Sequence, residues 1–161
     1  GLLRFISDTR PGLCLAAACY PEKHLQAKSF DTDIRHLKGK QDAGARFLIS
    51  QLCHDVPAFE RFLERIRKAG VTLPVLAGVM PALNKDGIVR MTLFNGCAIP
   101  RELSEVIGRY GADPDDFRQA GKEFTVRQIE KFARLDIAGI HLYTLNKYPD
   151  VADIVAAARL G

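Results

Sequence analysis

The sequence comprises 161 residues, of which 47% are hydrophobic and 26% are charged, and its formal net charge is +4 at pH 7. This balance is typical of one soluble globular domain, and no apolar run approaches the roughly 20 residues that a membrane span requires. Basic and acidic residues are interspersed, so the small positive excess fits a pocket for an anionic cofactor better than a nucleic-acid surface.

Two features of the sequence bear on the compartment of the protein. The N-terminal stretch GLLRFISD lacks a charged segment followed by a long apolar core, which argues against a secretory signal, and without an initiator methionine Gly1 can be a cut point. None of the four cysteines forms a C-x-x-C pair, so a zinc site is not predicted. We expect Cys14, Cys19, Cys53 and Cys97 to be free, buried thiols of a cytoplasmic protein.

The first elements that the sequence predicts are a strand and a helix. Residues 13–19 (LCLAAAC) are a compact apolar run that predicts a buried parallel strand. An amphipathic helix is predicted over residues 31–44, where Asp31 or Thr32 can cap the first turn and Gly44 ends the last one.

Two further strands and one helix follow. Residues 46–51 and 73–79 are apolar runs of strand length, and a helix is predicted between them from Pro57 to Lys68. The apolar stripe of this helix consists of Phe59, Phe62, Leu63 and Ile66.

The second half of the chain is mainly helical. Short helices are predicted near 85–94 and 101–110, and a long helix over 113–135. Residues 138–143 (AGIHLY) predict the fourth strand, and residues 149–159 the last helix.

Alternation of strands and helices predicts a parallel α/β sheet in a single domain spanning residues 1–161. Pattern alone allows a doubly wound open sheet or a slice of a (β/α)8 barrel. The sequence holds no G-x-G-x-x-G and no P-loop, which disfavours the open sheet. We expect Leu15, Ile49, Leu76 and Ile140 to lie inside the sheet or against its helices.

Motifs at the predicted strand ends resemble those of methylenetetrahydrofolate reductases in order and spacing. The segments that carry the resemblance are ACYPEKHLQAKS (18–29), DIRHLKGKQDAGA (33–45), ISQL (49–52), LAGVMP (76–81), GCAIP (96–100) and GIHLYTLNK (139–147). The resemblance covers nearly the whole chain.

The resemblance implies a (β/α)8 TIM barrel to which this chain contributes the four C-terminal βα units. Such enzymes bind FAD at the carboxyl ends of the strands, take a hydride from NADH or NADPH, and pass it to methylenetetrahydrofolate. The family's acidic proton donor lies in the first half of the barrel, which this sequence does not contain, so no catalytic acid is expected here. An N-terminal half-barrel or a second polypeptide is expected to complete the barrel, and an oligomer is expected.

The resemblance also assigns site residues. The FAD-binding residues that it implies are Tyr20, His24, Ala27, Asp33, His36 and Lys40. Of these, Asp33, His36 and Lys40 share one helix face by their spacing, although a solvated face has the same spacing. Gln51, Met91 and Lys147 are implied for the substrates, and the Gln51 amide offers the donor and acceptor that a pterin edge or a nicotinamide amide requires.

Three features of the sequence depart from the family pattern. Leu52-Cys53-His54 replaces a pair of aromatic residues, Gly87 stands where a second folate-binding glutamine is common, and Met91 stands where a phenylalanine can pack on the nicotinamide. A nucleophilic triad of Cys53, His54 and Asp55 is not expected, because neighbouring residues on a strand point to opposite faces.

Two other functions are alternatives to the reductase. The first is a non-catalytic remnant or accessory subunit that binds FAD or a partner without turnover. A pterin-dependent methyltransferase is disfavoured because the sequence shows no cobalamin or zinc site.

Overall fold

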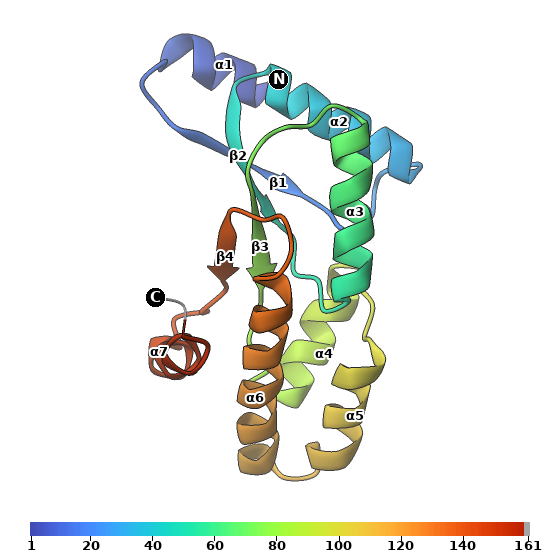
Figure 1. Ribbon diagram of the computed structural model, residues 1–161, viewed down its shortest axis with the longest axis vertical. Helices are drawn as coiled ribbons and strands as arrows, with labels where there is room; N and C mark the ends of the chain where they lie inside the picture. The colour runs from blue at the N-terminus through green and yellow to red at the C-terminus, as the bar shows by residue number, and fades with distance from the viewer. Residues whose placement is uncertain (160–161) are drawn as a thin grey trace.

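The computed structural model of the protein describes residues 1–159 (Figure 1). The strands are β1 (Leu15–Cys19), β2 (Ala45–Ser50), β3 (Val75–Val79) and β4 (Gly139–Leu142). The helices are α1 (Leu2–Thr9), α2 (Phe30–Asp42), α3 (Val56–Lys68), α4 (Lys85–Phe94), α5 (Arg101–Tyr110), α6 (Pro114–Phe132) and α7 (Tyr148–Ala157).

The four strands form one parallel sheet in the order β1-β2-β3-β4. Parallel crossovers are right-handed, so a strand order that never reverses places every crossover helix on the same face. A doubly wound sheet instead reverses its order at a switch point and carries helices on both faces. The described strands therefore form the arc expected for consecutive units of a (β/α)8 barrel.

Helices α2, α3 and α6 cover one face of this sheet. The main core cluster joins Leu48 and Val75 on the sheet to Phe59 of α3 and Phe132 of α6, and each of these four side chains is fully buried. The rings of Phe59 and Phe132 meet edge to face with centroids 4.9 Å apart. Residues two apart on a strand share a face, which explains why Ala77 and Val79 join the same core.

The opposite face of the sheet is open within the described residues. Ala16 and Ala18 of β1 are exposed, and Ile49 of β2 and Leu76 of β3 are only half-buried. In a closed barrel this face lines the interior. Of the four side chains expected inside the sheet or against its helices, Ile140 packs on the helix-covered core. Leu15, Ile49 and Leu76 are half-buried and lie outside this core.

Most predicted elements appear within a few residues of their expected bounds, and α4 and α5 match theirs. The cap of α2 differs, because Ser29, rather than Asp31 or Thr32, accepts a hydrogen bond from the Thr32 N–H at 3.1 Å. Strand β1 begins only at Leu15, so Cys14 is exposed while the other three cysteines are buried.

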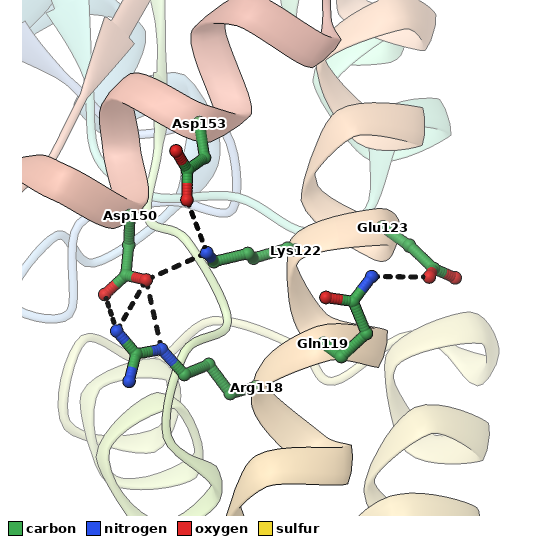
Figure 2. Close-up of polar contacts among 6 residues, drawn as sticks. All are labelled: Arg118, Gln119, Lys122, Glu123, Asp150 and Asp153. Carbon is green, nitrogen blue, oxygen red and sulfur yellow. Dashed lines mark hydrogen bonds and ion pairs between the residues drawn. The ribbon is translucent and has the colours of Figure 1, made fainter.

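The last helix is fastened to α6 by an ion-pair network (Figure 2). The carboxylate of Asp150, in the first turn of α7, is buried and accepts hydrogen bonds of 2.7–3.0 Å from the Arg118 guanidinium. The Lys122 ammonium lies 3.0 Å from Asp150 and 2.8 Å from Asp153. These contacts hold α7 beside α6 and so fix the segment that follows β4.

Among residues 1–159, no helix is both long and apolar enough to cross a membrane.

Candidate functional site

The carboxyl ends of the four strands lie at one edge of the sheet, where parallel α/β proteins place their active sites. Tyr20 follows β1, Gln51 follows β2, Met80 follows β3 and Tyr143 follows β4. The polar groups of the site project from this edge and from the segments that leave it.

A first cluster gathers after β1. The rings of Tyr20 and His24 meet edge to face, with centroids 4.5 Å apart. The His24 main-chain N–H donates to Asp33 Oδ2 at 2.9 Å, which ties the loop to α2. Lys40, two turns further along α2, places its Nζ 5.4 Å from the Tyr20 ring centroid. The structure therefore brings four of the six expected cofactor residues together.

The Lys40 ammonium is the charged group of this cluster. It donates to the Ala18 carbonyl oxygen at 2.7 Å, which leaves two of its three N–H groups for other acceptors. Burial lowers the pKa of Lys40, whereas the neighbouring Asp33 carboxylate raises it. A partly desolvated point charge with spare donors is suited to phosphate oxygens.

The other two expected cofactor residues stand apart. Ala27 lies on the same loop, where its carbonyl oxygen accepts from Lys23 Nζ at 2.8 Å and its N–H donates to the His24 carbonyl oxygen at 2.9 Å. Ala27 thus contributes to the site through its main-chain atoms, which help to fold the loop, and not through its side chain. His36 is exposed on α2, and its side chain makes no hydrogen bond or ring contact with the described residues.

A second cluster is built around Gln51. Its Nε2 donates to Asn95 Oδ1 at 2.8 Å, and its Oε1 accepts from the Leu52 main-chain N–H at 2.8 Å. Asn95 Nδ2 in turn donates to the Met91 carbonyl oxygen at 2.8 Å. Two expected substrate residues are thereby linked through Asn95, which sequence reasoning missed. The third, Lys147, is exposed at the N-cap of α7, and its side chain makes no hydrogen bond to Gln51 or Met91.

The two clusters are joined by the segment that follows α4. Glu22, on the β1 loop, accepts from the Ala98 N–H at 2.9 Å, and the Cys97 thiol donates to the Leu52 carbonyl oxygen at 3.1 Å. Burial raises the pKa of Glu22. Burial, together with the nearby Glu22 carboxylate, raises the pKa of Cys97 to about 12. These groups brace the two loops, and the Cys97 thiol stays protonated at neutral pH.

The Cys53-His54-Asp55 sequence does not form a nucleophilic triad, but the expected reason is wrong. These residues follow β2 in a loop rather than lying on the strand. Burial raises the pKa of the Cys53 thiol and lowers the pKa of His54 to about 4. The Asp55 carboxylate is engaged as the cap of α3, where it accepts from the Ala58 N–H at 2.9 Å. No thiolate–imidazole–carboxylate relay can form.

Comparison with known proteins identifies the family of this chain. The sequence model described as methylenetetrahydrofolate reductase matches residues 1–159. This chain belongs to the methylenetetrahydrofolate reductase family.

Relatives named as methylenetetrahydrofolate reductases occur in several kingdoms. The chain is 32% identical over 161 residues to methylenetetrahydrofolate reductase 1 of Schizosaccharomyces pombe, covering 99% of the chain and 26% of that protein. It is 29% identical over 147 residues to the 5,10-methylenetetrahydrofolate reductase of Salmonella typhimurium, covering 91% of the chain and 48% of that protein. It thus spans about a quarter of the fungal relative and about half of the bacterial one.

A solved structure confirms the fold class. It is described as an uncharacterized protein from Clostridium thermocellum that binds two copies of 5-methyl-5,6,7,8-tetrahydrofolic acid. The TM-score is 0.68 at 17% identity, over 97% of this chain and 56% of the other. With the family match, this likeness supports the TIM-barrel fold of methylenetetrahydrofolate reductases, of which this chain forms a part.

Proposed function

We propose that this chain is the half of a FAD-dependent reductase that binds the flavin and the folate. The reaction is the reduction of 5,10-methylenetetrahydrofolate to 5-methyltetrahydrofolate by ping-pong hydride transfer from NADH or NADPH. The observation that carries the proposal is the placement of the Tyr20–Lys40 cluster and the Gln51–Asn95 pair at one sheet edge, braced together by Glu22. FAD, when bound, supplies the relay of the hydride between the two substrates.

The β1 loop and α2 fit the polar part of FAD. Lys40 would bind the pyrophosphate through its two spare N–H groups, and Asp33 would hold the loop that carries Tyr20 and His24. Ala27 and His36 would contact the cofactor from the edge of the same surface. This donor set suits an anionic, ribose-containing ligand, which agrees with the family match.

The segment around Gln51 fits the substrates. Its amide would pair with the pterin edge and, in the other half of the cycle, with the nicotinamide carboxamide. Met91 would provide an adaptable apolar surface near the bound ring. Lys147 would lie near the anionic tail of the folate. A structural neighbour that binds methyltetrahydrofolate supports this substrate class.

The open face of the sheet implies a second set of strands. We propose that an N-terminal half-barrel, in the same polypeptide or a separate one, covers it, brings the proton-donating acid and completes the site, and that the assembly is an oligomer. Four free cysteines, three of them buried, support a cytoplasmic location.

The test is to assemble the barrel with its N-terminal half and measure flavin absorbance and folate-dependent oxidation of NADH or NADPH. The proposal predicts a bound flavin and turnover with methylenetetrahydrofolate as acceptor. A barrel that holds flavin without turnover would instead support the accessory-subunit function. Gly87, which replaces a second folate-binding glutamine of the family pattern, is the observation that favours this alternative. An assembled barrel that binds neither flavin nor folate would contradict both functions.

A further inference from the structure

The Asn95 side chain connects the carboxyl end of β2 to the carboxyl end of α4, 44 residues further along the chain. Its Oδ1 accepts from Gln51 Nε2 and its Nδ2 donates to the Met91 carbonyl oxygen, both at 2.8 Å. Both Gln51 and Asn95 are half-buried, so these bonds compete only partly with water.

We propose that Asn95 is a positioning residue that fixes the orientation of the Gln51 amide and thereby sets which hydrogen-bonding groups the substrate meets. This inference rests on the proposed function of Gln51. It adds a residue that does not itself touch the substrate but determines how the substrate-binding residue is presented.

The direction of the network follows from donor and acceptor chemistry. A carbonyl oxygen can only accept, so the Met91 carbonyl selects the NH₂ group of Asn95 and leaves Oδ1 facing Gln51. Oδ1 then selects the NH₂ group of Gln51. The Leu52 N–H can only donate, and it independently selects Oε1 at the other end of the amide. A flip of either amide would place two donors or two acceptors against each other.

The consequence is a defined hydrogen-bonding edge. After these internal bonds, Gln51 keeps one N–H and one acceptor position on Oε1. A ligand that presents an acceptor next to a donor, such as a cyclic amide or a primary carboxamide, matches this pair. Because the amide is already ordered, less rotational freedom is lost on binding.

The network also has a structural role, since the bond from Asn95 to the Met91 carbonyl closes the last turn of α4. The two roles use different atoms of the same side chain. Asn95→Leu removes both bonds. Asn95→Asp keeps an acceptor for Gln51 Nε2 but cannot donate to Met91.

A double-mutant cycle in the assembled barrel separates the two roles. The variants are Asn95→Leu, Asn95→Asp, Gln51→Leu and the double variant Asn95→Leu with Gln51→Leu. The measured quantities are the KM for methylenetetrahydrofolate, kcat, flavin content and thermal stability. Asn84→Ala is the matched control, because it removes a 2.7 Å cap bond to the Gly87 N–H at the other end of α4.

Positioning predicts that Asn95→Leu raises the folate KM about tenfold in the wild-type background, with flavin content unchanged. The same change should have less than about a twofold effect when Gln51 is already leucine. Asn95→Asp should have a folate KM closer to that of the wild type than Asn95→Leu has, but its thermal stability should stay lowered. Asn84→Ala should lower stability without any dependence on residue 51.

Equal effects of Asn95→Leu in both backgrounds would overturn the positioning role and leave Asn95 as a helix cap only. A wild-type folate KM in Asn95→Leu would overturn it as well, although the proposed function would stand if Gln51→Leu alone raised the KM. An unchanged KM in Gln51→Leu would instead remove the substrate site, and the positioning role with it.

Discussion

The Tyr143 hydroxyl donates a hydrogen bond of 2.9 Å to the main-chain carbonyl oxygen of Ser50, 93 residues earlier in the chain. To do so, the ring crosses β3 at Gly78, where an added Cβ would lie 3.0 Å from Tyr143 Cε2 and 2.2 Å from the Ser50 oxygen. The Ser50 hydroxyl accepts from the Gly78 N–H at 2.8 Å. These contacts tie three neighbouring strands together at Ser50, the residue before Gln51.

Gly78→Ala should therefore destabilise the protein by at least about 2 kcal/mol, because the clash is with main-chain atoms that cannot move freely. Gly108→Ala is the control, since nothing lies within 4 Å of its added Cβ and alanine favours the helix by about 0.5–1 kcal/mol. Urea unfolding followed by circular dichroism measures both changes. Equal stabilities for the two variants would show that Tyr143 does not pack across Gly78.

Lys40→Ala should weaken FAD retention about tenfold or more, since a charge-assisted bond to phosphate contributes about 1–3 kcal/mol. Lys38→Ala is the matched control, because Lys38 lies on the same helix and pairs with Asp42 instead. Flavin content after gel filtration and fluorescence titration with FAD give the two affinities. Loss of flavin from both variants alike would indicate a general charge effect, and loss from neither would remove Lys40 from the site.

Asp150 should make stability depend on pH. Hydrogen bonds from Arg118, helped by Lys122, hold the pKa of this carboxyl below its usual range. The unfolded chain then binds its proton at a higher pH than the folded chain does. The stabilisation is therefore present above the ordinary carboxyl pKa and is lost as the pH falls through the lowered one.

Asp150→Asn should consequently lower the free energy of unfolding at pH 7, and its difference from the wild type should shrink below about pH 4. Asp153→Asn should have a smaller effect, because its side chain is 69% exposed. Urea titrations at several pH values measure the difference. A gap between the wild type and Asp150→Asn that does not change with pH would show that the ion pair does not hold α7.

Much of the fold was predictable because the spacing of apolar residues along the sequence matches the residues that the structure buries. The apolar stripe of α3, including Phe59 and Ile66, has helical spacing and is buried as predicted. Helix α1 was missed because its cap, Gly1, makes no side-chain bond that a sequence pattern could reveal. Which face of the sheet Ile49 and Leu76 occupy could not be predicted, since apolar composition does not distinguish a helix-covered face from an open one.

The site was predictable only in part, because some of its contacts join segments that are far apart in the sequence. Tyr20, His24, Asp33 and Gln51 occur in motifs that family resemblance can match. Asn95 lies between motifs and acquires its role from a contact across 44 residues, which no local pattern encodes. An asparagine followed by glycine is a common way for a helix to end, and Gly96 indeed has a positive φ, so the local sequence indicates only a helix end at Asn95.

The open sheet face leads to a prediction about association. Residues 1–161 expressed alone should form dimers or larger species, because the edges of β1 and β4 and the face at Ala18 and Ile49 are unpaired among the described residues. Ala18→Lys should reduce association by placing a charge on this face. Light scattering with size exclusion measures the mass. A well-behaved monomer of the unmodified chain would contradict the half-barrel arrangement.

Stopped-flow absorbance of the two half-reactions in the assembled barrel tests the substrate-binding role of Gln51 most directly. In Gln51→Leu the folate edge loses its hydrogen bonds, which costs about 1–3 kcal/mol per unsatisfied group. Flavin content should stay near that of the wild type, since the proposed FAD contacts come from the Tyr20 loop and α2. Folate reduction should fall about 10-fold to 100-fold, and flavin reduction by NADH or NADPH should slow as well. Wild-type rates in both half-reactions, with unchanged folate affinity, would contradict the placement of the substrate at this edge of the sheet.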